Sequence, residues 1–336
     1  MDDIVKAETV ACTNADDRFW LGFDLGGTKM LSAIFDKKMQ IVARRRRKTK
    51  GSEGAVAGVA RIIETMERNL SEAGVSAKQL RGIGIGCPGP VNPQKRRILL
   101  APNLGWRNVD IGDALQNHFG CPVAVLNDVD AGVYGEYRVG AGKGASTVVG
   151  IFPGTGIGGG CVYKGLILQG ASITCMEIGM TKLSSHSGAS GGGLVGTLEA
   201  EASRLAIAAE ASKAAYRGEA PWLMKNAGTD ISAIRSSTLA ESVKQDPVVK
   251  LIVEQAAETI GIATANLIHL LAPEKIILGG GLVEAMESLF IDIVSKTAKR
   301  NVLVPFRDTF TVVPAKLGDD AGVYGSAAWI EHEVGE

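Results

Sequence analysis

Cysteine is scarce in this sequence, and its spacing is uninformative. Five cysteines occur among 336 residues, and none of them forms a CxxC pair. An odd number of scattered cysteines argues against a disulfide framework and against a cysteine-based zinc site. Cysteines of this kind usually serve as small buried apolar residues in a protein of the reducing cytosol. We therefore expect a cytoplasmic protein.

An excess of one charge and long hydrophobic runs are missing as well. Lys+Arg and Asp+Glu both number 36, which gives a net charge of zero, whereas nucleic-acid-binding proteins carry a basic excess. No apolar run approaches the ~18 residues of a membrane span. The N-terminus MDDIVKAETVACTNADDR is acidic and polar, without the apolar segment of a secretory signal. The sequence thus predicts no nucleic acid partner, no membrane span and no signal peptide.

One local exception to the charge balance is the run Arg44-Arg45-Arg46-Arg47-Lys48. Such a run can be the solvated end of a strand and its loop, or it can be a patch for nucleic acid or polyphosphate. The sequence favours the solvated strand end.

The length and the apolar content suggest two domains. At roughly 100–200 residues a domain, a chain of 336 residues exceeds one ordinary core. Strand-like and helix-like segments alternate in both halves, which is typical of α/β layering. Residues 197–216, 247–272 and 319–330 have helical period and length. Glycine turns at 26–27 and 154–160 each lie between two apolar strands, which suggests an internal duplication.

The first glycine turn lies in GFDLGGTKML, where an acid follows an apolar run. The spacing GxxxxGK[ST] of a P-loop is missing, and a strand follows the glycines where a P-loop has a helix. Gly26 and Gly27 would let the backbone approach an anion closely, with a hydroxyl from Thr28 and a charge from Lys29. Asp24 could hold a hydrated magnesium ion. The alternative is an ordinary Gly-Gly hairpin with an exposed acid and lysine.

The second glycine turn, GTGIGG, matches the dinucleotide-binding pattern GxGxxG. That fold requires a helix to begin at the glycines, but the strand-like segment CVYKG follows here. We therefore interpret the turn as a second phosphate-facing hairpin. Thr155 and the backbone amides of Gly154 and Gly156 would then contact a nucleotide.

Motifs spread along most of the chain occur together in a fixed order. They are FDLGGTK, GIGIGCPGPVN, LNDVDAGVYGE, FPGTGIGGG, EIGM, LEAEAS, PEKIILGGGL and DDAGVYGSA. From residue 20 to about 330 the chain resembles the ROK family of bacterial sugar kinases and sugar-responsive repressors, a branch of the actin-like ATPase superfamily.

This resemblance implies an α/β, two-domain actin-like ATPase (ribonuclease H-like) fold. Such a fold has mixed sheets flanked by helices and a cleft between its domains. We expect a flexible tail at 1–18, a small N-terminal domain of residues 19–127 plus 319–336, and a large C-terminal domain of residues 128–318.

The resemblance also implies an activity. Members use ATP with Mg²⁺ to phosphorylate a hexose, commonly at C6 of glucose, and frequently form homodimers, so we expect a homodimer here. Fructose, mannose, N-acetylmannosamine and N-acetylglucosamine stay open as acceptors, and polyphosphate stays open as donor. A sugar-responsive regulator is the alternative, although a repressor needs an added DNA-binding domain for which the roughly 18 residues before the first strand leave no room. An inactive sugar-binding protein is a further alternative.

By the same resemblance, Asn127-Asp128 at the end of an apolar strand carries the catalytic aspartate. Asp128 would take the proton from the attacking sugar hydroxyl, and Asn127 would lie beside the substrate. A general base of this kind is worth perhaps 10²–10⁴-fold in rate. The structural alternative is a polar strand end that caps the following helix.

Other positions match the family's ligand contacts. Glu177 and Glu199 correspond to acidic sugar ligands, and Asn103 resembles another contact near the sugar. The Gly280-Gly281 turn resembles the contact on the adenosine side, or serves close packing of a helix on a strand. For Glu199, which lies in a helix-forming stretch, the alternative is a solvated helix face.

The chain departs from the family at one loop. Many members have a histidine after EIG and a cysteine-rich zinc loop before the second glutamate. Here Met180 follows EIG and the loop has no cysteine, so a closed tetrahedral zinc site cannot form there. We predict no structural zinc and expect His186 to be a surface loop residue. The missing histidine also puts glucose itself in question as the substrate.

Overall fold

The computed structural model describes residues 18–184, 188–191 and 193–335. Contacts between Cα atoms divide the chain into two compact units. Unit 1 consists of Met1–Lys143, Ile167–Cys175 and Asp319–Glu336, and unit 2 of Gly144–Leu166 and Met176–Gly318. Most of the tail expected at 1–18, and His186, lie outside the described residues.

Unit 1 contains a five-stranded mixed sheet with the order β3-β2-β1-β4-β8. Strand β2 runs antiparallel to both β1 and β3, whereas β1, β4 and β8 run parallel to one another. The bounds are β1 (Phe19–Leu25), β2 (Lys29–Phe35), β3 (Ile41–Lys48), β4 (Leu80–Cys87) and β8 (Val123–Asn127). A smaller sheet has the order β5-β6-β7, with β5 (Val91–Asn92), β6 (Arg97–Ala101) and β7 (Trp106–Val109).

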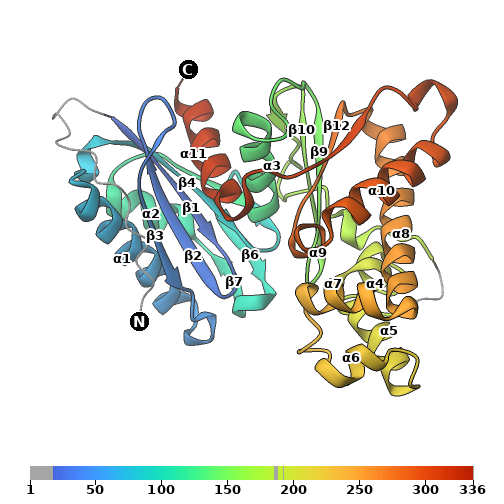
Figure 1. Ribbon diagram of the computed structural model, residues 1–336. Helices are drawn as coiled ribbons and strands as arrows, with labels where there is room; N and C mark the ends of the chain where they lie inside the picture. Colours follow the sequence, from blue (N-terminus) through green and yellow to red (C-terminus); the bar gives the residue numbers. More distant parts are fainter. Residues whose placement is uncertain (1–17, 185–187, 192, 336) are drawn as a thin grey trace. The chain divides into compact units, whose positions relative to one another are not determined.

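Helices cover both faces of the larger sheet of unit 1. They are α1 (Ala55–Ala73), α2 (Ile111–Phe119), α3 (Asp128–Val139) and α11 (Ala321–Val334). Helix α1 packs on β2 and β3, and α11 packs on β1 and β4 (Figure 1). The main core lies on the α1 side, where Ile83 and Ile85 of β4 meet Ile62 and Met66 of α1.

The alternation GIGIG in β4 explains how α11 fits on the other face. Successive residues of a strand point to opposite faces, so the isoleucines enter the core while the glycines face α11. A Cβ at Gly84 would lie 1.8 Å from the carbonyl oxygen of Ser326, and one at Gly22 of β1 would lie 2.0 Å from that of Val323. Glycine is therefore required for helix and sheet to approach this closely.

The domain boundary differs from the one expected. Residues 128–143 group with unit 1 instead of the second domain, and so do 167–175. Helix α3 packs along α11, where the rings of Tyr134 and Trp329 meet edge to face with centroids 5.1 Å apart. The apolar contact to a helix far away in sequence thus decides the unit to which α3 belongs.

The basic run forms most of β3, at the edge of the sheet. Each of its arginines has a carboxylate partner in the same unit: Arg44 with Asp320, Arg45 with Glu72, Arg46 with Asp319 and Arg47 with Glu64. Charged side chains on an edge strand discourage pairing with another chain. The run is thus a charged strand edge whose arginines are already paired.

Unit 2 repeats the strand order of unit 1. Its five-stranded sheet has the order β11-β10-β9-β12-β13, with β9 antiparallel to β10 and parallel to β12. The bounds are β9 (Val148–Pro153), β10 (Ile157–Tyr163), β11 (Leu166–Ile167), β12 (Lys275–Leu278) and β13 (Thr311–Pro314). Strands β1 and β9 hold the same central place, and each is followed by a glycine hairpin. This agreement supports the internal duplication.

The helices of unit 2 are α4 (Leu198–Ala202), α5 (Arg204–Tyr216), α6 (Pro221–Asn226), α7 (Ser236–Gln245), α8 (Pro247–Leu271), α9 (Gly281–Ala285) and α10 (Glu287–Asn301). Of the two helices predicted in unit 2, the one at 247–272 is present as α8, whereas the one at 197–216 is interrupted. The single helix predicted at 197–216 is broken at Ser203, which is extended (ψ 163°) and whose hydroxyl accepts a hydrogen bond from the amide of Ala206. Ser203 therefore ends α4 and caps α5.

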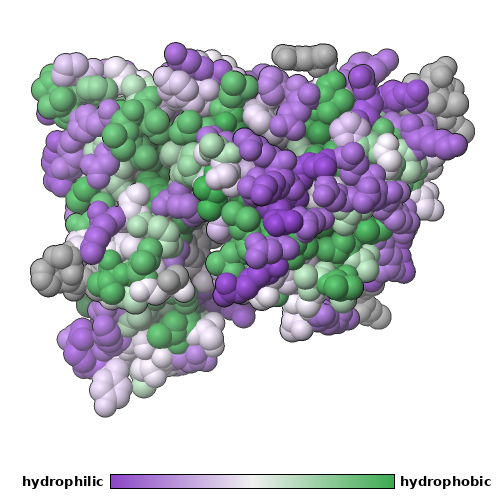
Figure 2. Space-filling model, turned by 180° about the vertical axis from the view of Figure 1, so that it is seen from behind, coloured by the Kyte–Doolittle hydropathy of each residue, from purple (hydrophilic) through white to green (hydrophobic). Residues whose placement is uncertain are grey.

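Hydrophilic and hydrophobic residues are interspersed over the face drawn in Figure 2. Of the helices in the described part of the chain, none is long and apolar enough to cross a membrane. Cys87, Cys121 and Cys161 are buried, and Cys175 is partly buried. The burial of the first three agrees with their expected role as small apolar residues.

Candidate functional site

Acidic residues gather where the parallel strands of unit 1 end. Asp24 of β1 pairs in register with Gly86 of β4, and Cys87 of β4 pairs with Asn127 of β8. Asp128 follows as the first residue of α3. Burial raises the pKa of the Cys87 thiol, and the carboxylates of Asp128 and Asp24 raise it further. Both carboxylates therefore lie near the same buried sulfur atom, at one edge of the sheet.

Asn127 fixes the position of Asp128. Its Oδ1 accepts hydrogen bonds from the amides of Val129 (2.8 Å) and Asp130 (3.2 Å), and its Nδ2 donates to the carbonyl of Gly89 (3.1 Å). The helix-capping interpretation thus applies to Asn127. Asp128, one residue further, is half-buried, and its Oδ1 accepts from the amide of Val129 at 3.0 Å. The strand, the cap and the helix hold its carboxylate in place.

The hairpin between β1 and β2 is closed by backbone hydrogen bonds. The amide of Gly26 donates to the carbonyl of Lys29 at 3.0 Å, and the Thr49 hydroxyl donates to the carbonyl of Gly26 at 2.7 Å. A Cβ at Gly27 would lie 3.3 Å from the Cβ of Asn103. Gly27 of the predicted phosphate-facing hairpin and Asn103, the predicted sugar contact, therefore lie side by side. The exposed side chains here are those of Thr28, Lys29 and Asn103.

Lys29 lies in an ion-pair network that the sequence did not predict. Its Nζ lies 2.8 Å from Asp319, and Arg46 lies 2.8 Å from the same carboxylate. Burial and the neighbouring Asp319 raise the pKa of Asp24 to about 6, while Lys29 and Arg46 act in the opposite direction. Asp319 lies far away in sequence, and no local motif identified it.

The raised pKa of Asp24 predicts a pH-dependent stability. Because the native pKa of about 6 exceeds the ordinary 3.8, the native state binds this proton more tightly than the unfolded state. The contribution of the Asp24 carboxyl group to the free energy of unfolding therefore falls as the pH rises from 3.8 to about 6, and it stays lower above that range. We expect Asp24→Asn to raise stability by about 3 kcal/mol at neutral pH and by nothing below the ordinary pKa.

Thermal melts of wild type and Asp24→Asn across this pH range measure that difference. Asp308→Asn, at an exposed position, is the control and should follow the wild-type curve. A difference between Asp24→Asn and wild type that does not change with pH would contradict the assigned burial of Asp24.

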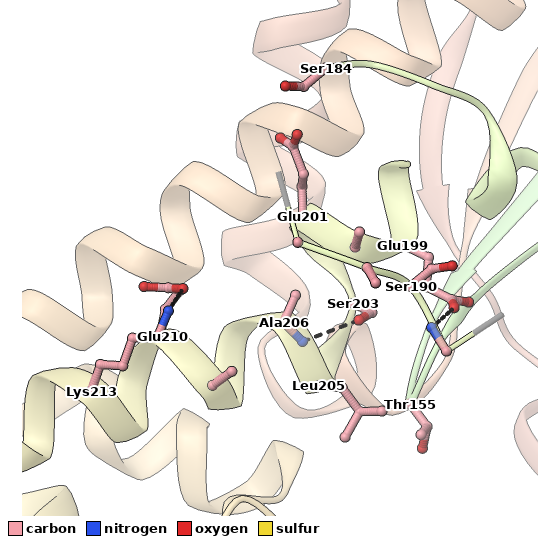
Figure 3. Close-up of a pocket in the computed structure, with 15 residues that line it drawn as sticks. Thr155, Ser184, Ser190, Glu199, Glu201, Ser203, Leu205, Ala206, Glu210 and Lys213 are labelled. Carbon is pink, nitrogen blue, oxygen red and sulfur yellow. Dashed lines mark hydrogen bonds and ion pairs between the residues drawn. The ribbon is translucent and has the colours of Figure 1, made fainter. Parts of the chain in front are cut away.

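In unit 2, Glu199 connects the second hairpin to a neighbouring loop. Its Oε2 accepts from the amide of Ile157 and its Oε1 from that of Gly191, both at 3.0 Å. Figure 3 shows the position of Glu199 near Ser190. The amide of Gly154 donates to the carbonyl of Gly156 at 2.8 Å, so this amide serves the turn itself. Glu199 is half-buried, and its carboxylate is bound by two backbone amides. The alternative that Glu199 is a solvated residue on an exposed helix face is therefore wrong.

Glu177 lies within electrostatic range of Glu199. The surrounding protein and the Glu199 carboxylate raise the pKa of the Glu177 carboxyl group. The two predicted sugar ligands of unit 2 thus lie near one another, although they are far apart in sequence. Met180 follows on the short 3-10 helix Ile178–Met180, and its sulfur accepts from the Ser190 hydroxyl at 3.9 Å.

A pocket of about 690 Å³ adjoins the second hairpin. Its lining includes Thr155, Ser190, Glu199, Glu201 and Ser203. Figure 3 draws Thr155, Ser190 and Glu199 toward one end and Glu210 and Lys213 toward the other. One pocket thus brings a predicted donor contact and a predicted sugar ligand together within a single unit.

The glycine turn before α9 packs against the end of β9. Gly280 has a φ of 81°, and a Cβ there would lie 2.9 Å from the carbonyl oxygen of Pro153. The packing interpretation of this turn therefore applies, and it places the turn beside the second hairpin. The adenosine contact stays a prediction. Across the described parts of the chain, no group of three or more His, Cys, Asp or Glu residues could hold a metal ion.

The repeated strand order, with a glycine hairpin in each unit and carboxylates at the strand ends, defines the actin-like ATPase fold. The chain belongs to the ROK family, whose sequence pattern matches residues 20–333. It is 32% identical over 315 residues to a glucokinase of Halalkalibacterium halodurans, which covers 94% of this chain and 95% of the relative.

A solved structure and a regulator are also similar to this chain. A ROK family glucokinase from Streptomyces griseus, crystallised with glucose and AMPPNP, has a TM-score of 0.77 and 29% identity, covering 93% of this chain and 98% of that one. A xylose repressor of Caldicellulosiruptor bescii is 27% identical over 270 residues, which is 80% of this chain and 67% of the repressor. Both kinases and regulators are therefore among the relatives.

Proposed function

We propose that this chain transfers the γ-phosphate of ATP to a hydroxyl group of a hexose, with C6 of glucose or a related sugar as the acceptor. Its similarity to glucokinases over nearly the whole length makes it a sugar kinase. The observation that supports the finer proposal is the position of Asp128 at the end of β8, at the same edge of the sheet as Asp24 at the end of β1, with β4 between the two strands.

Asp128 would act as the general base. A carboxylate at a strand end can take the proton of a sugar hydroxyl as the oxygen attacks phosphorus. Phosphoryl transfer depends mainly on positioning and charge stabilisation, so the orientation of this carboxylate matters as much as its basicity. The bonds from Asn127 to the start of α3 and to Gly89 supply that orientation.

The proposed sugar ligands are Glu177, Glu199 and Asn103. Carboxylate and amide groups bind neighbouring hydroxyls, and leaving such groups unpaired penalises a sugar that lacks one of them. The proposed contacts of the donor phosphates are Gly27 and Thr28 of the first hairpin and Thr155 of the second. Gly280 and Gly281 would adjoin the nucleoside.

Asp24 fits an Mg²⁺ ion held through water. This ion keeps several waters and binds through one or two carboxylates plus substrate phosphates, so it requires no larger cluster of ligands. Asp24 lies half-buried at a strand end, and a cation bound there would stabilise its carboxylate and lower its raised pKa. When bound, Mg²⁺ would neutralise charge on the donor phosphates.

Glu177 and Glu199 should differ in the substrate that they affect. We expect Glu177→Ala to raise KM for the sugar about tenfold and to leave KM for ATP unchanged, because it loses a sugar hydrogen bond only. Glu199→Ala should raise both constants, because Glu199 also holds the amides of Ile157 and Gly191. Steady-state kinetics with each substrate varied in turn measure the two effects. An unchanged KM for ATP in Glu199→Ala would show that Glu199 does not position the second glycine hairpin for binding ATP.

A panel of hexoses and N-acetylhexosamines, each assayed with ATP and with polyphosphate, tests the proposed function. Turnover of one sugar with one donor supports it and identifies both substrates. Absence of turnover, together with DNA binding, would favour the regulator, whereas sugar binding alone would favour an inactive binding protein. The homodimer, the cytoplasmic location and the absence of nucleic acid stay predictions.

A further inference from the structure

A second pocket of unit 2, of about 760 Å³, lies next to the pocket that contains Glu199. Leu205 lines both pockets. The polar part of the second lining consists of two arginines and three serines: Arg204, Arg235, Ser232, Ser236 and Ser237. No carboxylate is among its lining residues, which distinguishes it from the first pocket. The pocket is thus positively charged and rich in hydroxyl groups.

Arg204 connects this pocket to the second glycine hairpin. It is the first residue of α5, and its amide donates to the carbonyl of Gly154 at 2.9 Å. Its guanidinium donates to the hydroxyl of Thr155 at 3.0 Å and to the carbonyl of Ile234 at 3.4 Å. The guanidinium group is therefore fixed beside the threonine predicted to contact a nucleotide.

The two arginines have no acidic partner in the part of the chain that the structure describes. No carboxylate there lies within 4 Å of Arg204 or Arg235, in contrast to the arginines of β3. Two guanidinium groups without a counter-charge around one pocket favour an anionic ligand. Because the guanidinium fork matches the geometry of phosphate oxygens, a phosphorylated ligand fits best.

Ser236 of the pocket lining adjoins the glycine turn before α9. A Cβ at Gly281 would lie 3.4 Å from the hydroxyl oxygen of Ser236. The pocket therefore extends between the two features of unit 2 that were predicted to contact the donor, namely Thr155 and the Gly280-Gly281 turn. The exposed apolar side chains of Leu205 and Ile231 complete its lining.

We infer that Arg204 and Arg235 bind the phosphate chain of the phosphoryl donor in this pocket. The inference rests on the proposed kinase function and adds two donor-binding residues to it. The shared chemistry is a chain of linked phosphates, which either a nucleoside triphosphate or an inorganic polyphosphate supplies. Neither arginine belongs to a glycine-rich motif, so the sequence patterns did not identify them.

Calorimetric titration of the full chain with AMPPNP, in the presence of Mg²⁺, tests this inference without turnover. We expect Arg204→Met and Arg235→Met each to weaken binding about tenfold or more, and Arg204→Lys to weaken it less. Arg217→Met, at the end of the same helix and paired with Glu219, is the matched control and should bind as wild type. KM for the sugar should not change in any of these variants.

Competition separates the two sources of phosphate. Displacement of AMPPNP by inorganic tripolyphosphate supports a site for the phosphate chain, whereas displacement by adenosine but not by tripolyphosphate would overturn it. Wild-type affinity in both methionine variants, with unchanged melting temperatures, would also overturn the inference. The proposed function fails by a different result, namely that the wild type binds AMPPNP but phosphorylates no sugar.

Discussion

Replacing Asp128 by Asn should lower kcat by about 10²–10⁴-fold and leave the affinity for the sugar nearly unchanged. The amide has almost the shape of the carboxylate, so the contacts of the strand end are kept, but it cannot take the proton of the attacking hydroxyl. A coupled assay measures kcat, and calorimetric titration of the sugar measures its affinity. The loss belongs to the chemical step and not to binding.

The matched control is Asp113→Asn on α2, where the carboxylate is exposed and pairs with Arg96. Surface ion pairs contribute little, so this variant should retain full activity. Wild-type turnover in Asp128→Asn would refute the assignment of the base. Loss of sugar affinity equal to the loss of kcat would make Asp128 a ligand and not a base.

The sequence predicted most of the hairpins and strand ends because these depend on local patterns. Alternating apolar residues define the strands, and paired glycines mark the turns that join them. Asp24, Asn127 and Asp128 were identified as strand-end residues, and the structure places them at one edge of the sheet. Parallel pairing brings such ends together, which is why this part of the site could be predicted.

The partners of these residues could not be predicted in the same way. Asp319, which pairs with Lys29, is 290 residues away, and neither residue carries a pattern that indicates the other. The break at Ser203 was missed because apolar periodicity continues through it, although serine is a common helix cap. That break places Arg204 at the start of α5, beside Thr155. Tertiary contacts therefore determine both the Lys29–Asp319 ion pair and the position of Arg204 beside Thr155.

Gly325→Ala should destabilise unit 1 by about 3 kcal/mol. A Cβ at Gly325 of α11 would lie 1.7 Å from the carbonyl oxygen of Ala131 and 2.7 Å from the amide of Gly135, both on α3. These are backbone atoms, so the two helices would have to move apart. A lower melting temperature, by about 6–12 °C, is the expected result.

Gly132→Ala in α3 is the control, because its Cβ would meet only the Cβ of Ala321, at an ordinary 3.9 Å. Alanine at this helical position should be neutral or stabilising by up to about 1 kcal/mol. Equal losses in both variants would show that close contact between α3 and α11 is not what stabilises unit 1.

This contact also bears on the site. Helix α3 begins at Asp128, and a Cβ at Gly322 in the first turn of α11 would lie 2.9 Å from the carboxyl carbon of Asp24. Separating the helices should therefore shift the carboxylate of Asp128 relative to that of Asp24. We expect Gly325→Ala to lower kcat even below its melting temperature, whereas Gly132→Ala should not.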